Sequence, residues 1–308
     1  MPNYEIIPPY PTETSYDLYD DLVHHISLSG KGLPNIKRRI VKIVSVDGGV
    51  DDGYTIEPRR MQLKFAIKES SQSALNTKID QIYEIFRPQQ SELAMRLKVT
   101  RDDASVREIL CHVDGTFEID DEEYLGGTLK TIVVPLIAPN PIWYDPTQHT
   151  KNITIGSSGD TYSFTEYAGS WHEYPVLRVY GQIEDPGFII NFQKRYPGAS
   201  SATNFQYIFY LSGTIPDSDY YDINLLPGIK TIYDSGGTNR LNTLSGSSDE
   251  FGEWRIEPDP YLTNFQLTYV SKNANADLDI IYYDRYIGIW VIKFITMHIF
   301  LMIQKELI

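Results

Sequence analysis

Apolar and polar residues alternate along much of the first half of the chain. Residues 61–68 read MQLKFAIK, in which Met61, Leu63, Phe65 and Ile67 share one face and polar residues dominate the other. This alternation is typical of a strand with one buried face. Strand patterns also occur in AMRLKVT, REILCHVD and GTLKTIVVPLI. Together they predict a mostly antiparallel sheet.

One helix is predicted over residues 73–87. Ser71 or Ser73 can cap its first turn, and Pro88 ends it. The apolar residues recur at helical spacing, so the helix is expected to cover one face of the sheet. These residues are Leu75, Ile79, Ile82, Tyr83 and Phe86. The first half is therefore predicted to be an α+β unit.

The N-terminal stretch gives weaker signals. Residues 1–36 are expected to be irregular because prolines interrupt them early. A first strand is predicted near 39–46, and DGGVDDGY after it is typical of a hairpin loop, with glycines at 48, 49 and 53.

The chain changes character after Pro146. Short strand patterns recur about every ten residues, separated by Gly, Asn and Ser turns, which is typical of a β-sandwich. The fold class is therefore mainly β: an N-terminal α+β domain over 1–146 followed by a C-terminal β-sandwich over 147–289. Residues 290–308 form an atypical apolar extension.

The charge of the chain argues against nucleic-acid recognition. The net charge is -14, and the halves 1–146 and 147–308 each carry -7, so neither half is basic. The densest basic cluster is Lys37, Arg38 and Arg39, which we interpret as a solvated strand end.

The single cysteine, Cys111, alternates with Ile109 and Val113, so it is expected to be a small buried apolar residue. One cysteine excludes a disulfide framework and a cysteine-rich zinc site. The first residues, MPNYEIIPPY, have neither the basic nor the apolar region of a signal peptide. We therefore expect synthesis and folding in a cytoplasm.

No motif indicates an enzyme, a metal or a cofactor. The DGGVDDG stretch lacks the ligand spacing of an EF-hand loop. The carboxylate pairs at 102–103 and 120–123 lie in turns, where charge runs are usually solvated. The six histidines lack metal-site spacing on a helix. We predict no catalytic, cofactor-binding or metal site.

Aromatic residues of the second half leave two interpretations open. Exposed rings on a β-sandwich can stack on sugars, whereas large aromatic side chains are more often buried. We favour burial for the two tryptophans. The residues in question are Trp171, Tyr220, Tyr221 and Trp254.

Residues 136–146 read LIAPNPIWYDP and lie where the two halves meet. Each proline pushes the residue before it to extended geometry, so the chain leaves the first sheet stiffly. We expect the Trp and Tyr to pack this exit against the first domain and the Asp to accept a bond from a nearby backbone N–H. The residues of this expected domain joint are Pro139, Pro141, Trp143, Tyr144, Asp145 and Pro146.

Several short motifs occur in an order that resembles the distal tail proteins (Dit family) of siphophages, chiefly those of Gram-positive hosts. They are GKGLP at 30–34, PRRMQLKFAI at 58–67, REILCHVDGTFE at 107–118, APNPIWYDP at 138–146 and DRYIGI at 284–289. Each is short, and their order and spacing carry the resemblance over residues 20–289. The closing motif contains Asp284, Arg285, Tyr286 and Gly288.

The resemblance implies a structural role. Such proteins form a homohexameric ring through the N-terminal domain, at the tip of the virion tail. The ring meets the tail tube protein on one side and the tail-associated fibre or lysin protein on the other. The C-terminal domain is a galectin-like or carbohydrate-module-like sandwich, which in some members carries receptor-binding proteins or binds the host surface. Assembly takes place in the cytoplasm of the bacterial host.

The extension after RYIGI is unusual for this family. Residues 287–303 are strongly apolar but contain Lys293 and His298, and a membrane span needs about 20 apolar residues. We therefore expect an added packing segment or an extension of the reading frame rather than a membrane anchor.

Three functions remain open at this point. The first is a distal tail hub protein without enzymatic activity. The second is a carbohydrate-binding module, residues 147–289, that recognises host cell-wall polysaccharide during adsorption. The third, which has the least support, is a tail hydrolase of the host wall.

Overall fold

The computed structural model of the chain falls into two compact units. The first consists of Met1–Tyr144 together with Ile287–Ile308, and the second is Asp145–Tyr286. The chain therefore passes into the second unit once and returns from it. The structure describes residues 2–8, 15–18, 23–42, 49–87, 94–120, 128–194, 203–246, 248, 254–258 and 263–289.

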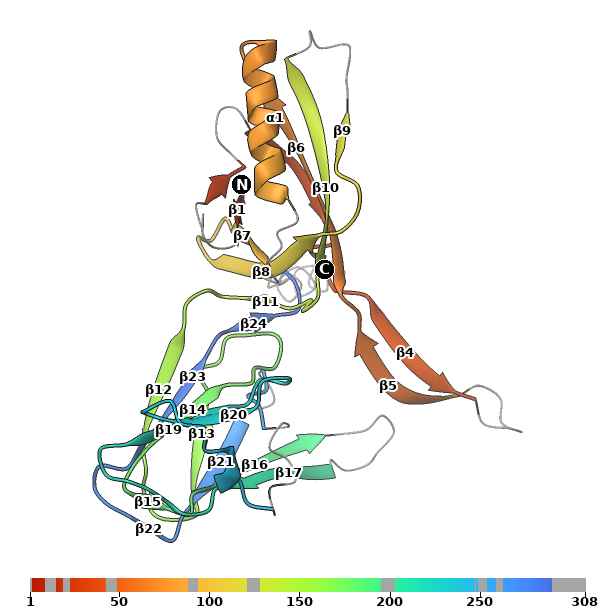
Figure 1. Cartoon of the computed structure of the whole chain (residues 1–308). Helices are drawn as coiled ribbons and strands as arrows, with labels where there is room; N and C mark the ends of the chain where they lie inside the picture. Colours follow the sequence, from red (N-terminus) through yellow and green to blue (C-terminus); the bar gives the residue numbers. More distant parts are fainter. Residues whose placement is uncertain are drawn as a thin grey trace, which may run out of the picture. The chain divides into compact units, whose positions relative to one another are not determined.

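An antiparallel sheet forms the body of the first unit (Figure 1). Its strands run in the order β2-β1-β7-β8-β10-β6-β3, with β9 beside β10 and β11 beside β8. Their bounds are β1 Asn3–Ile7, β2 Tyr16–Asp17, β3 Val23–Ser29, β6 Arg59–Lys68, β7 Met95–Thr100, β8 Val106–Val113, β9 Glu118–Asp120, β10 Leu129–Ala138 and β11 Trp143–Tyr144.

The alternation along β6 sets the core of this sheet. Met61, Leu63, Phe65 and Ile67 are all buried, as predicted, and the first three pair with the apolar residues Leu136, Val134 and Ile132 of β10. Cys111 of β8 is also fully buried, and burial raises the pKa of its thiol to about 12. The cysteine is therefore a packing residue.

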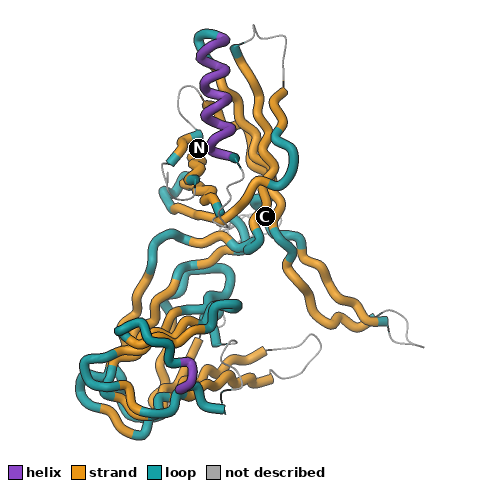
Figure 2. Tube along the Cα trace, in the orientation of Figure 1, coloured by secondary structure: helices purple, strands orange, loops and turns teal. Residues whose placement is uncertain are grey.

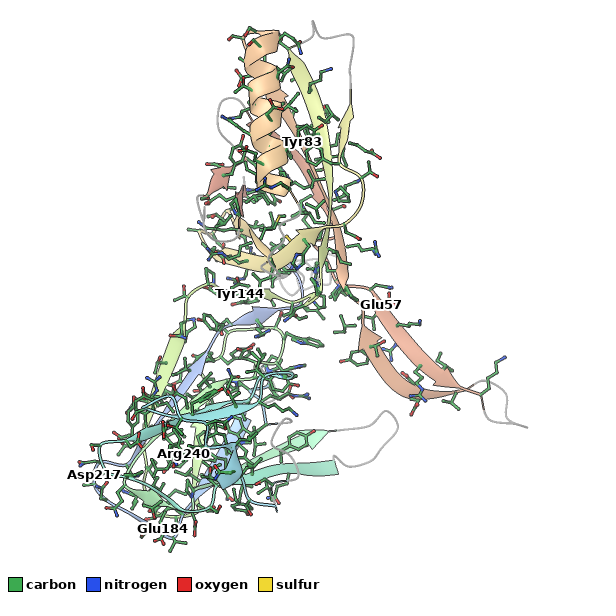
Figure 3. The ribbon with its side chains drawn as sticks, viewed as in Figure 1. Glu57, Tyr83, Tyr144, Glu184, Asp217 and Arg240 are labelled. Atoms are coloured by element: carbon green, nitrogen blue, oxygen red, sulfur yellow. The ribbon has the colours of Figure 1, made fainter. Side chains whose placement is uncertain are left out.

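Helix α1 (Gln72–Phe86) begins within one residue of its predicted start. The Ser71 hydroxyl accepts a hydrogen bond from the Ala74 backbone N–H at 3.2 Å, which caps the first turn. Phe86 packs against Phe65 of β6, with ring centroids 6.2 Å apart. Tyr83, which the pattern places on the apolar stripe, is instead 46% exposed. Figure 3 labels this residue on α1.

The expectation that residues 1–36 are irregular was wrong. β1 pairs in antiparallel register with β7, from Asn3 opposite Thr100 to Ile7 opposite Arg96. β3 pairs with β6 on the other side of the sheet. The short alternation of buried Tyr4 and Ile6 was the local signal for β1, and the nearby prolines obscured it.

A separate two-stranded hairpin interrupts the first unit between β3 and β6 (Figure 1). It consists of β4 (Ile36–Val41) and β5 (Val50–Ile56). The predicted loop was wrong at its end, because residues 50–54 are part of β5. Gly53 adopts φ +102°, close to the point where the pairing register shifts, which explains why a turn-forming residue lies inside a strand.

The second unit contains two main sheets, whose strands are orange in Figure 2. The two sheets share one apolar core. One has the order β12-β23-β14-β19-β20 and the other β13-β21-β16-β17, with a small sheet β18-β15-β22 beside them. The bounds are β12 His149–Thr154, β13 Asp160–Phe164, β14 Val176–Tyr180, β15 Ile183–Glu184, β16 Gly187–Lys194, β17 Thr203–Tyr210, β18 Thr214–Ile215, β19 Tyr220–Asn224, β20 Thr231–Asp234, η2 Leu241–Thr243, β21 Thr263–Thr268, β22 Ser271–Lys272, β23 Asp277–Tyr282 and β24 Arg285–Tyr286.

The mainly β fold class is thus confirmed. The chain passes between units at Tyr144 and Asp145, close to the expected boundary at 146, and residues 287–289 lie with the first unit. The predicted extension 290–308 lies outside the described residues. In the part of the chain that the structure describes, the helices are too short or too polar to cross a membrane.

Candidate functional site

The proline-rich segment after β10 leads into the short strand β11. The Asn140 side-chain oxygen accepts a hydrogen bond from the Ile142 backbone N–H at 3.3 Å, which fixes the turn between Pro139 and Pro141. Ile142 and Trp143 are then buried. Trp143 is thus buried within the first unit, and its role in packing the exit stays a prediction.

Tyr144 is held at both its backbone and its hydroxyl. Its backbone pairs with Glu108 of β8, and its hydroxyl donates to the Glu108 carboxylate at 3.1 Å. Glu108 is buried, so this donor satisfies a carboxylate that has lost most of its water. The last residue before the crossing is therefore fixed to the first unit.

On the side of the second unit, the expected contact of Asp145 is present. Its carboxylate accepts from the Thr147 backbone N–H at 2.9 Å, which makes a tight turn at Pro146. Its own backbone N–H donates to the Asp284 carbonyl at 2.9 Å. The residue that opens the second unit is thus bonded to one near its end.

A buried arginine, Arg59, lies beside the exit. It is the first residue of β6 and only 2% exposed. Its guanidinium donates to four backbone carbonyls: from Nε to Pro141 at 2.8 Å, from Nη1 to Gly30 at 2.7 Å and Gly32 at 2.5 Å, and from Nη2 to Ile287 at 2.7 Å. One side chain therefore joins three segments that are far apart in the sequence.

The Arg59 charge is compensated by dipoles. Among the described residues it has no carboxylate partner, and its guanidinium carbon lies 6.0 Å from the centre of the Trp143 ring. Burial lowers the pKa of Arg59 to about 10, so the side chain stays charged at neutral pH. A charge held in this way fixes its neighbours, because any carbonyl that moves away leaves a buried donor unpaired.

The sequence interpretation missed Arg59, although a signal was present. The alternation of buried residues in β6 runs back from Met61 to position 59, so the arginine lies on the buried face of the strand. Buried arginines are rare unless they are paired. Charge at a core position was the available clue.

The return segment lies in the same place. Ile289 is buried, and its backbone N–H donates to the Lys31 carbonyl at 3.2 Å. A Cβ atom on Gly288 would lie 3.1 Å from the Gly32 carbonyl oxygen, closer than most such contacts. Residues of four of the motifs that carried the family resemblance therefore meet around Arg59.

The remaining residues of the closing motif lie in the second unit. Asp284 accepts from the Ala168 backbone N–H at 3.0 Å and lies 3.6 Å from the His149 ring nitrogen Nε2. Arg285 forms an ion pair with buried Glu173. Tyr286 is buried. These contacts are structural, since each polar group is matched inside the unit.

The four aromatic residues weighed for sugar stacking lie in different environments. Trp254 and Tyr221 are buried in the sandwich core, so neither ring can meet a ligand at the surface. Trp171 is partly buried beside His172, with ring centroids 4.7 Å apart. Tyr220 points to the outer face of the five-stranded sheet, on the side opposite to Tyr221.

That outer face carries a row of polar and aromatic side chains. Strand pairing places Asn152, Asp279, Arg178, Asp222 and Tyr233 side by side across all five strands. The Arg178 guanidinium donates to both Asp222 oxygens, at 2.7 and 2.8 Å. Asn152 donates to Asp279 at 3.0 Å. We call these five residues the outer row.

Two tyrosines flank the outer row. The Tyr180 hydroxyl donates to Asp279 at 3.0 Å, and the Tyr220 ring lies under the Arg178 guanidinium, 4.4 Å from its central carbon. The hydrogen bonds of Asp222 raise the pKa of Arg178. The face therefore presents ordered donors, acceptors and ring surfaces.

In the described part of the chain, no three His, Cys, Asp or Glu side chains lie close enough together to bind a metal ion. Asp103 of the expected carboxylate pair instead accepts from the Ser105 hydroxyl and backbone in a turn. The acidic residues Asp51 and Asp52 pair with Arg38 and Arg39 across the hairpin.

Comparisons with known proteins connect the chain to phage tails. Residues 18–133 match the family of the phage tail protein RIFT-related domain. The solved Dit protein of phage SPP1 superposes with a TM-score of 0.63 at 12% identity, over 92% of this chain and 98% of that one. Two structures of the phage p2 baseplate reach 0.44 and 0.46 at 12% identity, over 91% of this chain and 98% of theirs. No curated protein sequence matches the chain significantly.

These findings confirm the resemblance at two levels. Residues 18–133 of the first unit match the model of a phage tail domain, and the chain has the fold of SPP1 Dit. The order of the short motifs was therefore a sound guide, although the solved relative shares few identical residues.

Proposed function

We propose that the chain is a structural distal tail protein of a siphophage and that six copies form a ring at the tip of the tail. The phage tail domain at 18–133 supports the tail role. The fold supports the hub role, because SPP1 Dit is described as a paradigm of the hub adsorption apparatus in phages that infect Gram-positive hosts. Nothing in the described residues points to an enzyme.

The observation that carries self-association is the hairpin β4–β5. It pairs with no third strand among the described residues, and an isolated hairpin is only marginally stable in water. It also presents large apolar side chains to solvent, with Ile40 63% exposed. The other exposed apolar residues of the hairpin are Ile36, Val41 and Tyr54.

Such a hairpin needs a surface to cover it, and a second copy of the chain supplies one. A closed ring uses one face of each subunit against a different face of the next, so an arm and a receiving surface are both expected. The ion pairs between β4 and β5 keep the arm soluble before it docks. The exposed apolar residues on either side of these pairs then provide the buried contact.

Native mass spectrometry tests this proposal directly. Six chains of 35.3 kDa give about 212 kDa. The variant Ile40→Asp places a charge in the proposed contact and is expected to leave monomers. Val270→Asp, at a site that is 69% exposed in the second unit, is the matched control and should assemble like the wild type. A wild-type chain that stays monomeric at all concentrations would overturn the proposal.

A ring at the tip of the tail implies the partners of the protein. The ring would join the tail tube protein on one side and the tail-associated fibre or lysin protein on the other, with receptor-binding proteins or the host surface as further contacts. The protein would be made and assembled in the host cytoplasm and would end in the virion tail tip. Cryo-electron microscopy of virions with labelled chains tests each of these contacts.

Binding of host cell-wall polysaccharide by the second unit is a second candidate function, and the outer row favours it. Sugars offer hydroxyl groups that donate and accept and C–H faces that rest on aromatic rings. The face combines Arg178 with Asp222, Asp279 and the exposed Tyr233. Its acidic excess over basic groups favours a neutral polysaccharide over an anionic wall polymer.

Titration calorimetry with neutral glucan, galactan and rhamnan fragments tests this second function. Tyr233→Ala should abolish binding, whereas Tyr233→Phe keeps the ring and should retain it. Tyr83→Ala, an exposed tyrosine of the first unit, is the control. If none of the neutral fragments binds, or if anionic polyglycerol phosphate binds instead, the carbohydrate function is rejected for this face.

A further inference from the structure

Arg59 connects the base of the hairpin to the return of the chain. The hairpin strands begin at Ile36 and end at Ile56, and Arg59 follows three residues later. Its guanidinium binds the Gly30 and Gly32 carbonyls, which precede the hairpin on the other side. Both ends of the hairpin are therefore tied to one side chain.

We infer that Arg59 and the return segment, residues 287–289, together form a built-in clamp that positions the hairpin for docking, and that the clamp closes only when the chain has returned from the second unit. In this clamp Arg59 is a positioning residue, and residues 287–289 are the segment with which it acts. The consequence for assembly rests on the proposed self-association. The clamp itself does not.

The hairpin base and the return segment share the Arg59 guanidinium. Nη1 serves the hairpin base at Gly30 and Gly32, whereas Nη2 serves Ile287 of the return segment. If the return segment leaves, a buried charged N–H loses its acceptor in a site that water reaches poorly. Arg59 would then move toward solvent and release the Gly30 and Gly32 carbonyls.

The return segment also contacts the hairpin base directly, without Arg59. The Ile289 backbone N–H donates to Lys31, which lies between the two glycines that Arg59 binds. The Ile289 side chain is buried, and Gly288 approaches the Gly32 carbonyl closely. The return segment therefore holds the hairpin base through its own backbone, at Ile289 and at Gly288.

The backbone conformation at the hairpin base is also restricted. Gly30 adopts φ +73°, and a Cβ atom there would collide with the Arg60 carbonyl oxygen. At the other side of the base, the Asn35 carbonyl accepts from the Glu57 backbone N–H at 2.9 Å, and the two side chains are hydrogen-bonded as well. The base is thus shaped for one close-packed arrangement rather than for a hinge.

The contact between Arg59 and Ile287 spans 228 residues of sequence. Contacts of such long range close late because the chain between them must first be ordered. The whole second unit lies within this interval. The hairpin would accordingly become fixed only in a finished chain, and partly made chains would not dock to one another.

Hydrogen exchange on the full-length protein tests the clamp. In Arg59→Lys, an ammonium group cannot reproduce the planar set of donors, and amides of residues 30–35 and 287–289 should exchange at least about tenfold faster. Gly288→Ala should give the same regional pattern from the other partner. Arg60→Lys is the matched control, because that side chain is exposed and bonded only to Asp114 among the contacts seen here.

The same variants are then weighed by mass photometry. Arg59→Lys and Gly288→Ala should both reduce the fraction of rings, whereas Arg60→Lys should not. Unchanged exchange at 30–35 in both variants would overturn the clamp, as would equal acceleration throughout both units. If the wild type forms no rings while the exchange pattern appears as expected, the clamp stands and the proposed self-association fails.

Discussion

In the second unit, Phe188 and Phe209 of one sheet stack 4.7 Å apart, and Val179 and Ile223 of the other sheet belong to the same core. In the first unit, the hairpin β4–β5 presents Ile40 to solvent instead. A closed core makes a unit self-sufficient, whereas an uncovered hairpin makes it depend on a partner. This contrast is the reason why we propose self-association for the first unit and ligand binding for the second.

The largest expected effect is on the core of the second unit. Trp254 is fully buried and its ring meets Phe265 edge-on, with centroids 5.7 Å apart. Trp254→Ala should lower the free energy of unfolding of this unit by about 3–5 kcal/mol, because it leaves a large cavity. Chemical denaturation followed by hydrogen exchange in each unit measures this. If the first unit is destabilised as strongly, the two units are not independent.

The second prediction concerns acid and the second unit. Burial lowers the pKa of His172 to about 3, and the nearby charges of Arg255 and Arg285 add to this. The unfolded chain takes up a proton below its ordinary pKa of about 6.5, whereas folded His172 stays neutral. Stability is therefore complete above about pH 6.5 and falls toward pH 3, by at most about 1.4 kcal/mol per pH unit.

Denaturation curves between pH 7 and pH 4 check this sign. His172→Gln should flatten the pH dependence of the second unit, and His24→Gln, an exposed site of the first unit, should not change it. A wild-type protein whose second unit gains stability on acidification would contradict the buried neutral histidine.

A smaller effect is expected at the start of α1. Ser71→Ala removes the acceptor for the Ala74 backbone N–H and should cost about 1 kcal/mol of the stability of the first unit. Ser71→Asp keeps a capping oxygen and should restore most of it. Differential scanning calorimetry distinguishes the two. Equal loss in both variants would mean that the cap does not limit the stability of the unit.

Local patterns predicted much of this fold. The alternation in β6 and the stripe of α1 were readable because each depends on residues within a few positions of one another. The contacts of Trp143, Tyr144 and Asp145 were also expected, since prolines restrict the chain around them. The role of these residues as a domain joint stays a proposal. Trp143→Ala tests it: ring assembly should be weakened while both units remain folded.

Other features could not be predicted locally. The sequence pattern predicts a loop for part of β5, because Gly53 inside a strand gives the same signal as a turn. Arg59 was missed because its role depends on carbonyls contributed by residues 29 positions before it and 228 after it. Propensity and periodicity carry no information about such distant partners. Only the coincidence of a charge with a core position pointed to the site.

The smallest expected effect on stability comes from a substitution in the hairpin. It is the most direct test of the contrast between the hairpin and the core of the second unit. Ile40→Ser removes apolar surface that is mostly in water already, so the unfolding free energy of the monomer should change by less than about 0.5 kcal/mol. The same change should weaken association, because in the ring that side chain would be buried. Leu225→Ser, at a buried site of the second unit, should do the reverse and destabilise the monomer strongly. Concentration-dependent mass photometry beside denaturation curves separates the two outcomes, and a hairpin variant that unfolds the monomer would show that the hairpin belongs to the core of its own chain.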